Sequence, residues 1–373
     1  MTTRISLADA CLEVVDCVNR TAPETIDGEY FAIGTPAMRG NMLDLEQARR
    51  ISKDTFATWT RRLVPVEGDL LLAREAPVGP VIRIPAGGKY AAGQRTTHLR
   101  ANPAIVDPGF LYYLLVSPTV QSRLVSGAMG STVAHLRVAD VKNFQLPELP
   151  DLWSQRAIAE VLGALDDKIA ANRKLAETSD QLAAAMFRHA QLDAASGALG
   201  DVLSLNYGKA LPATKRLGGG VPVIGSGGVT GYHNEALIDG PAVVVGRKGT
   251  IGAVHWSNVP TYPIDTTFFV VPVSEGTIVY LYYLLRSLDW SEYNSDSAVP
   301  GLNRDQALRR SIPIVDDQRM SKFSTRAGEL LRIQDQLSVE SRTLSTLRDA
   351  LLPRLMSGEL RVRDAERVVE AAL

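Results

Sequence analysis

The residues of this sequence best suited to binding a ligand are two cations that lie between glycines. Gly246-Arg-Lys-Gly-Thr-Ile-Gly252 places Arg247 and Lys248 directly after an apolar run that predicts a buried strand. Glycines let the backbone approach a ligand closely, and two cations on such a loop suit phosphates or base edges. A solvated turn explains the same residues, so both interpretations stay open at this point.

A polar, glycine-rich segment upstream carries further candidate contacts to nucleic acid. Ser226, Tyr232, His233 and Asn234 lie within residues 225–234, which we interpret as a loop. Side chains of these types can contact base edges, and an asparagine can make a bidentate contact to adenine. Serine, glycine and asparagine are also common in ordinary turns, so this segment alone is weak support for binding.

The first half of the chain contains a related but unequal set. Arg74 corresponds to Arg247, but Glu75 stands where the second half has Lys248, and Arg95 could contact guanine or a local carboxylate. The two halves are therefore predicted to contact different groups. The candidate DNA contacts are Arg74, Lys89, Gln94, Arg95, Thr96, Thr97 and His98 in the first half and Lys209, Ser226, Tyr232, His233, Asn234, Arg247 and Lys248 in the second.

No catalytic or metal-binding signature accompanies these segments. The sequence lacks a phosphate-binding loop, a nucleophile elbow, a zinc-protease motif and a dinucleotide-binding fingerprint. Its five histidines are scattered, and its two cysteines, Cys11 and Cys17, have no second pair with which to hold zinc. We therefore predict no catalytic residue, no metal and no cofactor in this chain.

The composition is typical of a globular chain of two or three domains. Its 373 residues are 45% hydrophobic, with 40 Lys and Arg against 41 Asp and Glu. This near neutrality argues against a histone-like protein, so any nucleic-acid site must be a local group of cations. No apolar run is long enough for a membrane span or a signal peptide, and unpaired thiols suit a reducing compartment, so we expect a cytoplasmic protein.

The elements that would position these residues occur twice. Phe110-Leu-Tyr-Tyr-Leu-Leu115 recurs 170 residues later as Tyr280-Leu-Tyr-Tyr-Leu-Leu285. Further matches at nearby offsets are Arg95-Thr-Thr97 with Asp265-Thr-Thr267, Arg74 with Arg247, and Leu136 with Leu302. Such a period is too long for a solenoid, so the pattern indicates a duplicated domain. Short apolar runs between glycines and prolines predict strands at 69–72, 78–84, 242–245 and 267–273, with one helix around each Tyr-Tyr pair.

Each copy ends in a long helical pattern. Residues 152–192 contain no proline, and Ile158, Leu162, Leu165 and Ile169 alternate four and three residues apart, as on an amphipathic helix. After Pro313, a heptad seam is formed by Phe323, Leu330, Leu337, Leu344 and Leu351. About 40 residues of helix are about 60 Å long, so these two seams are expected to pack on each other, with faces left for a partner.

The predicted fold class is α+β. Two mixed β-rich domains, at residues 1–150 and 196–312, alternate with two long helices, at 151–195 and within 313–373, so that the order of parts is repeated. Two functions of different classes fit this order of parts. The first is a non-catalytic DNA-reading subunit, and the second is a two-headed coiled-coil adaptor that binds proteins without DNA specificity.

The chain resembles the specificity (S) subunit of type I restriction-modification systems over nearly its whole length. The matching segments are Leu146-Pro-Glu-Leu-Pro150, Gln155-Arg-Ala-Ile-Ala-Glu-Val-Leu162, Leu165-Asp-Asp-Lys-Ile169, Asn172-Arg-Lys-Leu175, the loops at 225–234 and 246–252, and Leu351-Leu-Pro-Arg-Leu-Met-Ser-Gly-Glu-Leu360. The resemblance implies two target recognition domains, each contacting one half of a split sequence in double-stranded DNA. It further implies that the two long helices pair antiparallel as a coiled-coil spacer, which gives the chain a pseudo-twofold repeat. In this family the spacer sets the distance between the half-sites and docks two methyltransferase (M) subunits. These would carry S-adenosylmethionine, while restriction/translocase (R) subunits would carry ATP and Mg²⁺.

Overall fold

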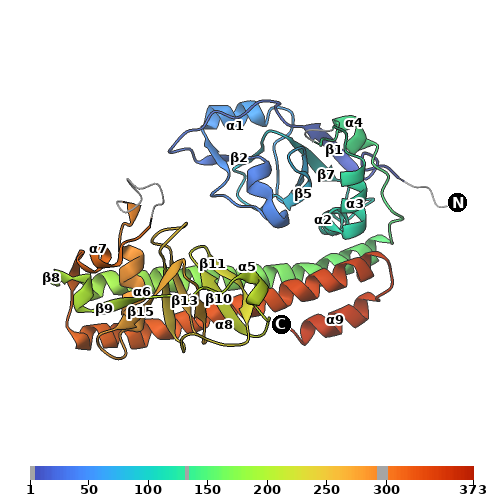
Figure 1. Ribbon diagram of the computed structural model, residues 1–373. Helices are drawn as coiled ribbons and strands as arrows, with labels where there is room; N and C mark the ends of the chain where they lie inside the picture. Colours follow the sequence, from blue (N-terminus) through green and yellow to red (C-terminus); the bar gives the residue numbers. More distant parts are fainter. Residues whose placement is uncertain (1–4, 131–133, 292–300) are drawn as a thin grey trace. The chain divides into compact units, whose positions relative to one another are not determined.

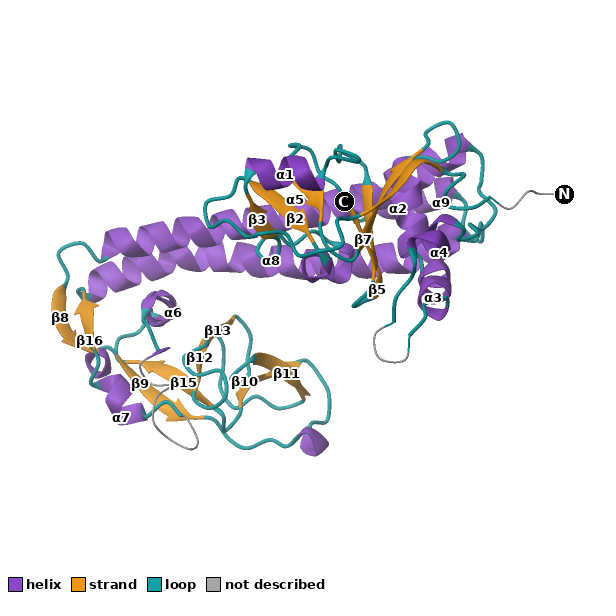
Figure 2. Ribbon diagram, turned by 90° about the horizontal axis from the view of Figure 1, so that it is seen from above, coloured by secondary structure: helices purple, strands orange, loops and turns teal. Residues whose placement is uncertain are grey.

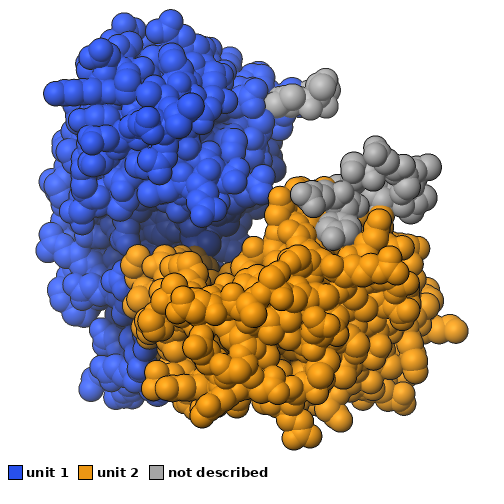
Figure 3. Space-filling model, turned by 90° about the vertical axis from the view of Figure 1, so that its left-hand side faces the viewer, with its two compact units in different colours: residues 1–170, 342–373 blue, residues 171–341 orange. Residues whose placement is uncertain are grey.

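A computed structural model describes residues 5–130, 134–291 and 301–373, which form two compact units. Unit 1 comprises residues 1–170 and 342–373, and unit 2 comprises residues 171–341 (Figure 3). Each unit combines a β-rich part with portions of two long helices. The domain limits predicted from the sequence remain predictions, because the compact units share the long helices instead of setting them apart.

Unit 1 is built on two small sheets. The larger sheet is antiparallel with the order β1-β7-β4-β5, in which β1 is Cys11–Asp16, β7 is Thr96–Ala101, β4 is Leu70–Arg74 and β5 is Val78–Arg83. The smaller has the order β3-β2-β6 and consists of Arg49–Ile51, Tyr30–Ile33 and Tyr90–Ala92. The helices are α1 (Lys53–Trp59), α2 (Pro108–Val116), α3 (Pro118–Ser126), α4 (Val138–Lys142) and the short 3-10 segment Thr35–Asn41.

Unit 2 repeats this plan. Its larger sheet has the order β9-β15-β12-β13, with β9 at Leu203–Tyr207, β15 at Thr267–Pro272, β12 at Ala242–Gly246 and β13 at Val254–Ser257. Its smaller sheet has the order β11-β10-β14 and consists of Gly228–His233, Val221–Gly225 and Tyr262–Pro263. The remaining elements are β8 (Ala195–Ala198), β16 (Ser311–Ile314), α6 (Ile278–Ser287), α7 (Arg304–Leu308) and two short 3-10 segments, Leu199–Asp201 and Ala213–Lys215.

The backbone hydrogen bonds establish which residues of the two units correspond. The amide of Arg74 donates to the carbonyl of Arg95, and that of Arg247 donates to Thr266, each over 2.9 Å. Likewise, the carbonyl of Arg74 accepts from Leu136, and that of Arg247 accepts from Leu302. The predicted duplication is therefore confirmed, and Arg74 and Arg247 are equivalent positions.

One of the predicted matches is wrong by a single residue. The hydroxyl of Thr96 donates to the carbonyl of Gly93, and that of Thr267 donates to Ile264, which makes Thr96 the counterpart of Thr267 rather than of Thr266. The sequence match failed because the two Thr-Thr pairs align equally well without knowledge of the strand register. The correct offset follows only from the pairing of β7 and β15 with their neighbours.

The long helices are α5 (Leu152–Ala190) and α8 (Asp317–Met356), which lie side by side in Figures 1 and 2. In unit 2, the rings of Phe187 and Phe323 are 5.7 Å apart, and the amide of Asn172 donates to Glu340 over 3.0 Å. These contacts make the two helices antiparallel. The predicted α+β fold with two long antiparallel helices is therefore confirmed.

The apolar seam between the helices is interrupted in the middle of α8. Ile158, Leu162, Leu165 and Ile169 are buried on α5, and Phe323, Leu344 and Leu351 are buried on α8. However, Leu330 and Leu337 are only half-buried, and no residue of α8 between Leu331 and Leu344 is buried. The strict heptad prediction is thus wrong for this stretch, where the contact between Asn172 and Glu340 replaces apolar packing.

Each unit attaches its Tyr-Tyr helix to α5 through a carboxylate. In unit 1, the Tyr113 hydroxyl donates to Asp166 over 2.7 Å, and Arg348 of α8 pairs with the same carboxylate over 2.6 Å. In unit 2, Tyr283 and Arg286 of α6 both contact Asp180. A carboxylate suits these two positions because it accepts a hydrogen bond from a tyrosine hydroxyl and pairs with an arginine. An apolar residue there would leave both of these groups unpaired.

Unit 1 also includes the terminal helix α9 (Val362–Glu370). Its Ala365 and Val369 are buried in the same hydrophobic core as Val161 and Leu352 of the long helices. Cys11 and Cys17 are both buried as free thiols, and burial, followed by the nearby charge of Asp69, raises the pKa of Cys11 to about 12. Within the described ranges, no helix has both the length and the apolar character needed to cross a bilayer.

Candidate nucleic-acid interface

The turn after β12 holds the guanidinium of Arg247 against aromatic rings. Its central carbon lies 4.9 Å from the ring centre of Tyr207 and 5.8 Å from that of Phe268. One terminal nitrogen of the guanidinium also donates to the carbonyl of Asp265 over 3.2 Å. These contacts fix the side chain without neutralising its charge, because rings and carbonyls attract a cation but carry no full negative charge.

Two further cations share this position. Arg304, the first residue of α7, lies 5.6 Å from the Tyr207 ring, and Lys248 is exposed next to Arg247. Together with Asn303 and Asp305, these residues line a hollow of about 260 Å³. The sequence did not single out Tyr207 or Arg304, because they are far from Arg247 in the chain and belong to β9 and α7.

The polar hairpin of unit 2 brings Ser226 to the same loop. Residues 225–234, predicted as a loop, instead form strands β10 and β11 around a turn at Ser226. The carbonyl of Ser226 accepts from Nε2 of His255 over 2.9 Å, and its Cβ would lie 3.3 Å from a Cβ added to Gly246. A Cβ on Gly246 would also lie 2.1 Å from the carbonyl oxygen of Thr250, so the tight closure of the cationic loop requires a glycine there.

The other candidates of that hairpin lie at its far end. The register pairs Val221 with His233 but Gly225 with Gly228, so Tyr232, His233 and Asn234 are remote from Ser226. His233 is buried, and its Nδ1 accepts from the amide of Leu217 over 3.3 Å. Tyr232, Asn234 and Lys209 are exposed. The structure thus brings together Ser226, Arg247 and Lys248, and it does not gather the remaining candidates around them.

Unit 1 neutralises the equivalent arginine. Arg74 is buried and forms an ion pair with Asp16 over 3.2 Å. Asp16 pairs with Thr97 in the sheet, as Tyr207 pairs with Phe268, so Asp16 and Tyr207 occupy the same register position. A carboxylate in unit 1 therefore replaces the aromatic ring of unit 2.

Most of the remaining unit 1 candidates lie inside the sheet. Thr96, Thr97 and His98 are buried in β7, and His98 Nε2 is 2.7 Å from Asp69. The sequence prediction grouped them with Gln94 and Arg95 as one polar cluster, because five consecutive polar residues do not reveal that three of them are buried in a strand. Lys89 is exposed just before β6.

Gln94 and Arg95 line a hollow of about 180 Å³ that also includes Gln47 and Arg49. Gln94 accepts from the Thr21 hydroxyl over 2.9 Å, and Arg95 pairs with Glu75 over 3.3 Å. Arg95 has a φ of 70°, a left-handed conformation that costs a side-chain-bearing residue energy and that clusters at functional sites. Sequence inspection missed Gln47 and Arg49 because no local motif connects them to Gln94.

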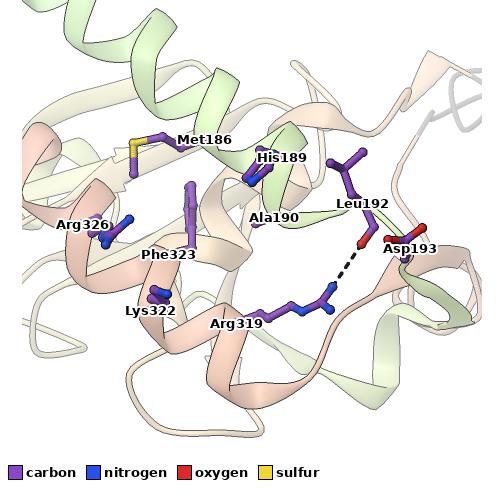
Figure 4. A pocket seen from close by; sticks show the side chains of 9 residues that line it. All are labelled: Met186, His189, Ala190, Leu192, Asp193, Arg319, Lys322, Phe323 and Arg326. Carbon is purple, nitrogen blue, oxygen red and sulfur yellow. Dashed lines mark hydrogen bonds between the residues drawn. The ribbon is translucent and has the colours of Figure 1, made fainter.

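A basic hollow of about 450 Å³ lies where α5 ends and α8 begins in unit 2 (Figure 4). Arg319, Lys322 and Arg326 of α8 face it, and Arg319 donates to the carbonyl of Leu192 over 3.1 Å. Met186 and Phe323 supply its apolar wall.

Comparison with known proteins supplies a family for these two units. A family model described as "Type I restriction modification DNA specificity domain" matches residues 19–178 and 193–332. A Mycoplasma genitalium protein provisionally named a type I specificity subunit is 26% identical over 72% of this chain and 76% of its own length. The specificity subunit of the HindI type I restriction enzyme of Haemophilus influenzae is 21% identical over 73% of this chain and 81% of its own.

A solved structure has the same fold. The crystal structure of the S subunit of a type I restriction-modification system from M. genitalium covers 95% of both chains with a TM-score of 0.67 and 21% identity. At that identity the likeness concerns the fold and not the contacts. Within the residues that can be described, no three His, Cys, Asp or Glu side chains gather as metal ligands would.

Proposed function

The chain belongs to the type I restriction modification DNA specificity family, and from this premise we propose that it is the non-catalytic subunit that reads a bipartite DNA target. In this proposal each unit contacts one half-site, and the companion subunits perform methylation and cleavage. Direct contacts from few side chains suffice, because each good bidentate pair contributes about 1 to 3 kcal/mol of discrimination between bases.

The observation that carries the proposal is the unequal chemistry at equivalent positions of two similar units. Among the described residues, no carboxylate lies within ion-pair distance of Arg247 beside Tyr207, whereas its counterpart Arg74 is paired with Asp16. Two units that repeat one fold but present different side chains suit two different half-sites. A protein whose two heads bound the same partner would need the same side chains at both positions.

The long helices supply the spacing in this proposal. Helices of 39 and 40 residues are each about 60 Å long, compared with about 34 Å for one turn of B-form DNA. A ruler of this length suits half-sites separated by unread base pairs. The gap in base pairs would therefore be set by the helices and would not change when contacts in either unit are altered.

The same helices offer surfaces for companion subunits. The middle of the pair exposes apolar side chains in unit 2, namely Leu175, Leu182, Ile333 and Val339. Next to them lies the basic hollow of Arg319, Lys322 and Arg326. We assign these surfaces to two docked methyltransferase (M) subunits, which would carry S-adenosylmethionine. Restriction/translocase (R) subunits would join the complex with ATP and Mg²⁺, and the whole assembly would act on DNA in the cytoplasm.

The neutral charge of the chain makes the partners important for affinity. Its 40 cationic and 41 anionic side chains leave no overall attraction for DNA. Phosphate contacts supply most non-specific affinity in such complexes. Much of that attraction must therefore come from the companion subunits, while this chain contributes the discrimination between sequences.

The test is methylation by the assembled complex. The chain is co-expressed with type I M subunits from the same source, and methylated adenines are mapped across the host DNA by single-molecule sequencing. We expect two short motifs separated by a fixed gap, and no such motif when this chain is omitted. A complex that assembles but neither binds DNA selectively nor yields a gapped motif would favour the protein-binding adaptor instead.

A further inference from the structure

The hollow beside Tyr207 holds more positive than negative charge. Arg247, Lys248 and Arg304 all line it, and among the described residues neither Arg247 nor Lys248 has a carboxylate within ion-pair distance. Among the described residues that line the hollow, the single acid is Asp305, which pairs with Arg304 over 3.3 Å. Three cations against one carboxylate leave an excess of two positive charges, so the hollow favours an anion.

Tyr207 contacts two guanidinium groups with one ring. Arg247 and Arg304 lie 4.9 and 5.6 Å from the centre of that ring. The electron-rich ring attracts both cations, which offsets part of the cost of placing them in one hollow. The ring therefore holds the two cations in place before a ligand arrives.

The side chains that remain available in the hollow are cationic hydrogen-bond donors, and the acceptor oxygen of its amide is already used. Asn303 is the one amide there, and its Oδ1 accepts from the backbone of Asp305 and Gln306 at the start of α7. With that oxygen engaged, the amide lacks the free donor and acceptor pair that contacts adenine. Arginine and lysine side chains grouped around one point suit the full charge of a phosphodiester.

Unit 1 provides the natural comparison, because it has the same arginine without the site. Asp16 occupies the register position of Tyr207 and neutralises Arg74 over 3.2 Å. The neighbouring residues diverge too, since Glu75 replaces Lys248 and Val138 begins α4 where Arg304 begins α7. Of the three cations of the hollow, unit 1 therefore retains a counterpart only for Arg247, namely the buried Arg74.

We propose that Tyr207, Arg247, Lys248 and Arg304 bind a phosphodiester group of the DNA backbone, and that unit 1 lacks this site because Asp16 stands in the place of Tyr207. The inference rests on the proposed function, since it takes DNA to be the ligand. It adds that the two units make different kinds of contact with DNA. Unit 2 anchors the backbone in addition to contacting bases, whereas the equivalent arginine of unit 1 only stabilises its sheet.

The test transplants the unit 1 residue into unit 2. The complex of the full chain with its M subunits is prepared with Tyr207→Asp, and binding is measured by fluorescence anisotropy over a range of salt concentrations. DNA with the gapped motif and DNA with a scrambled motif are both used. Because one phosphate contact contributes about 0.9 to the slope of log K against log salt, the slope should fall by about 1.

The matched control is Tyr207→Phe, which keeps the ring and should leave the slope unchanged. We expect Tyr207→Asp to weaken binding to both DNAs by a similar factor and to leave the methylated motif as it was. An unchanged slope with an altered motif would mean that the loop reads a base. An unchanged slope and an unchanged affinity would mean that the three cations bind no phosphate and belong to an ordinary solvated turn.

A second variant guards against misfolding. If Tyr207→Asp fails to assemble with the M subunits, the side-chain replacements Lys248→Gln and Arg304→Gln are combined, since both residues project from loops or helix ends. The same reduction in slope is expected, and an unchanged slope contradicts the proposed site. Failure of the wild-type complex to prefer gapped over scrambled DNA would instead overturn the proposed function, whatever the slopes of the variants.

Discussion

At three equivalent positions of their larger sheets, unit 1 has polar and charged residues and unit 2 has apolar ones. In unit 1, Asp69 is buried with His98 and Arg100, and both partners approach its Oδ2 to 2.7 Å. The strand pairings align β4 of unit 1 with β12 of unit 2, and β7 with β15. In this alignment the residues that correspond to Asp69, His98 and Arg100 are Ala242, Phe269 and Val271. An ionic cluster on one side of the repeat is thus an apolar patch on the other.

This difference teaches that the strand order does not depend on the chemistry of these three positions. The order of the four strands is shared, and the apolar strands β4 and β12 are buried throughout in both units. What does differ is how stability responds to charge. Burial raises the pKa of Asp69, but hydrogen bonds from His98 and Arg100 outweigh that effect and lower it to about 2.

The largest expected effect is the loss of the carboxylate charge in this cluster. Asp69→Asn leaves Arg100 partly buried without its counter-ion and weakens the hydrogen bond to the buried His98, which should destabilise unit 1 by about 3 to 5 kcal/mol. Urea unfolding followed by hydrogen exchange would report the free energy and identify the unit that opens. Asp239→Asn, an exposed carboxylate of unit 2, is the control and should change stability by less than about 0.5 kcal/mol. A comparable loss in unit 2, or none in unit 1, would contradict the comparison.

The helix pair offers a second contrast between the units. Leu344, in the unit 1 part of α8, is 1% exposed, whereas Leu337, in the unit 2 part, is half-buried. Leu344→Ala should cost about 2 to 4 kcal/mol, because it leaves a cavity, and Leu337→Ala should cost about 1 kcal/mol or less. Thermal unfolding of both variants checks the order. Equal losses would mean that the middle of the helix pair is packed as tightly as its end.

Lowering the pH should destabilise unit 1 more than unit 2, and this effect should be smaller than those of the substitutions above. A carboxyl whose folded-state pKa is lowered stabilises the fold above its unfolded pKa of about 3.9, and this contribution is lost as the pH falls toward 2. For Asp69, the loss is about 2 to 3 kcal/mol, borne by unit 1. The hydrogen bonds of Arg286 also lower the pKa of Asp180 in unit 2, but that side chain is 35% exposed and its effect is screened.

Hydrogen exchange at pH 5 and at pH 2.5 would measure this difference. The amides of β4 and β7 should lose more protection than those of β12 and β15 as the pH falls. In Asp69→Asn, the difference between the units should disappear, since the titrating group is gone. Equal acid sensitivity of both sheets in the wild-type chain would contradict the assignment of the lowered pKa to stability.

Local patterns in the sequence were enough to predict the duplication, the strands around the glycines and the two long helices. They were enough because apolar periodicity and the repeated Tyr-Tyr segments depend on neighbouring residues only. The same patterns nominated Arg247, Lys248 and Ser226, but on two separate segments, and they did not predict that these segments meet in space. They could not separate Arg74 from Arg247, since the deciding residues, Asp16 and Tyr207, lie on a different strand.

The misplaced candidates have the same physical origin. Thr97 and His98 are polar, and polarity in a β-run usually indicates an exposed face. Here, Asp69 supplies the buried partner for His98, and that pairing across two strands cannot be read from either segment alone. The heptad seam failed in the middle of α8 for a related reason, because Glu340 meets Asn172 of the other helix there.

The central claim is that two unequal units contact the two halves of one split target. The most direct measurement is the methylated motif of three complexes, containing the wild-type chain, the unit 1 variant Gln94→Ala with Arg95→Ala, and the unit 2 variant Ser226→Ala. Single-molecule sequencing should give one gapped motif for the wild type, with each variant relaxing a different half and leaving the gap unchanged. A continuous motif, or two variants that relax the same half, would contradict the account.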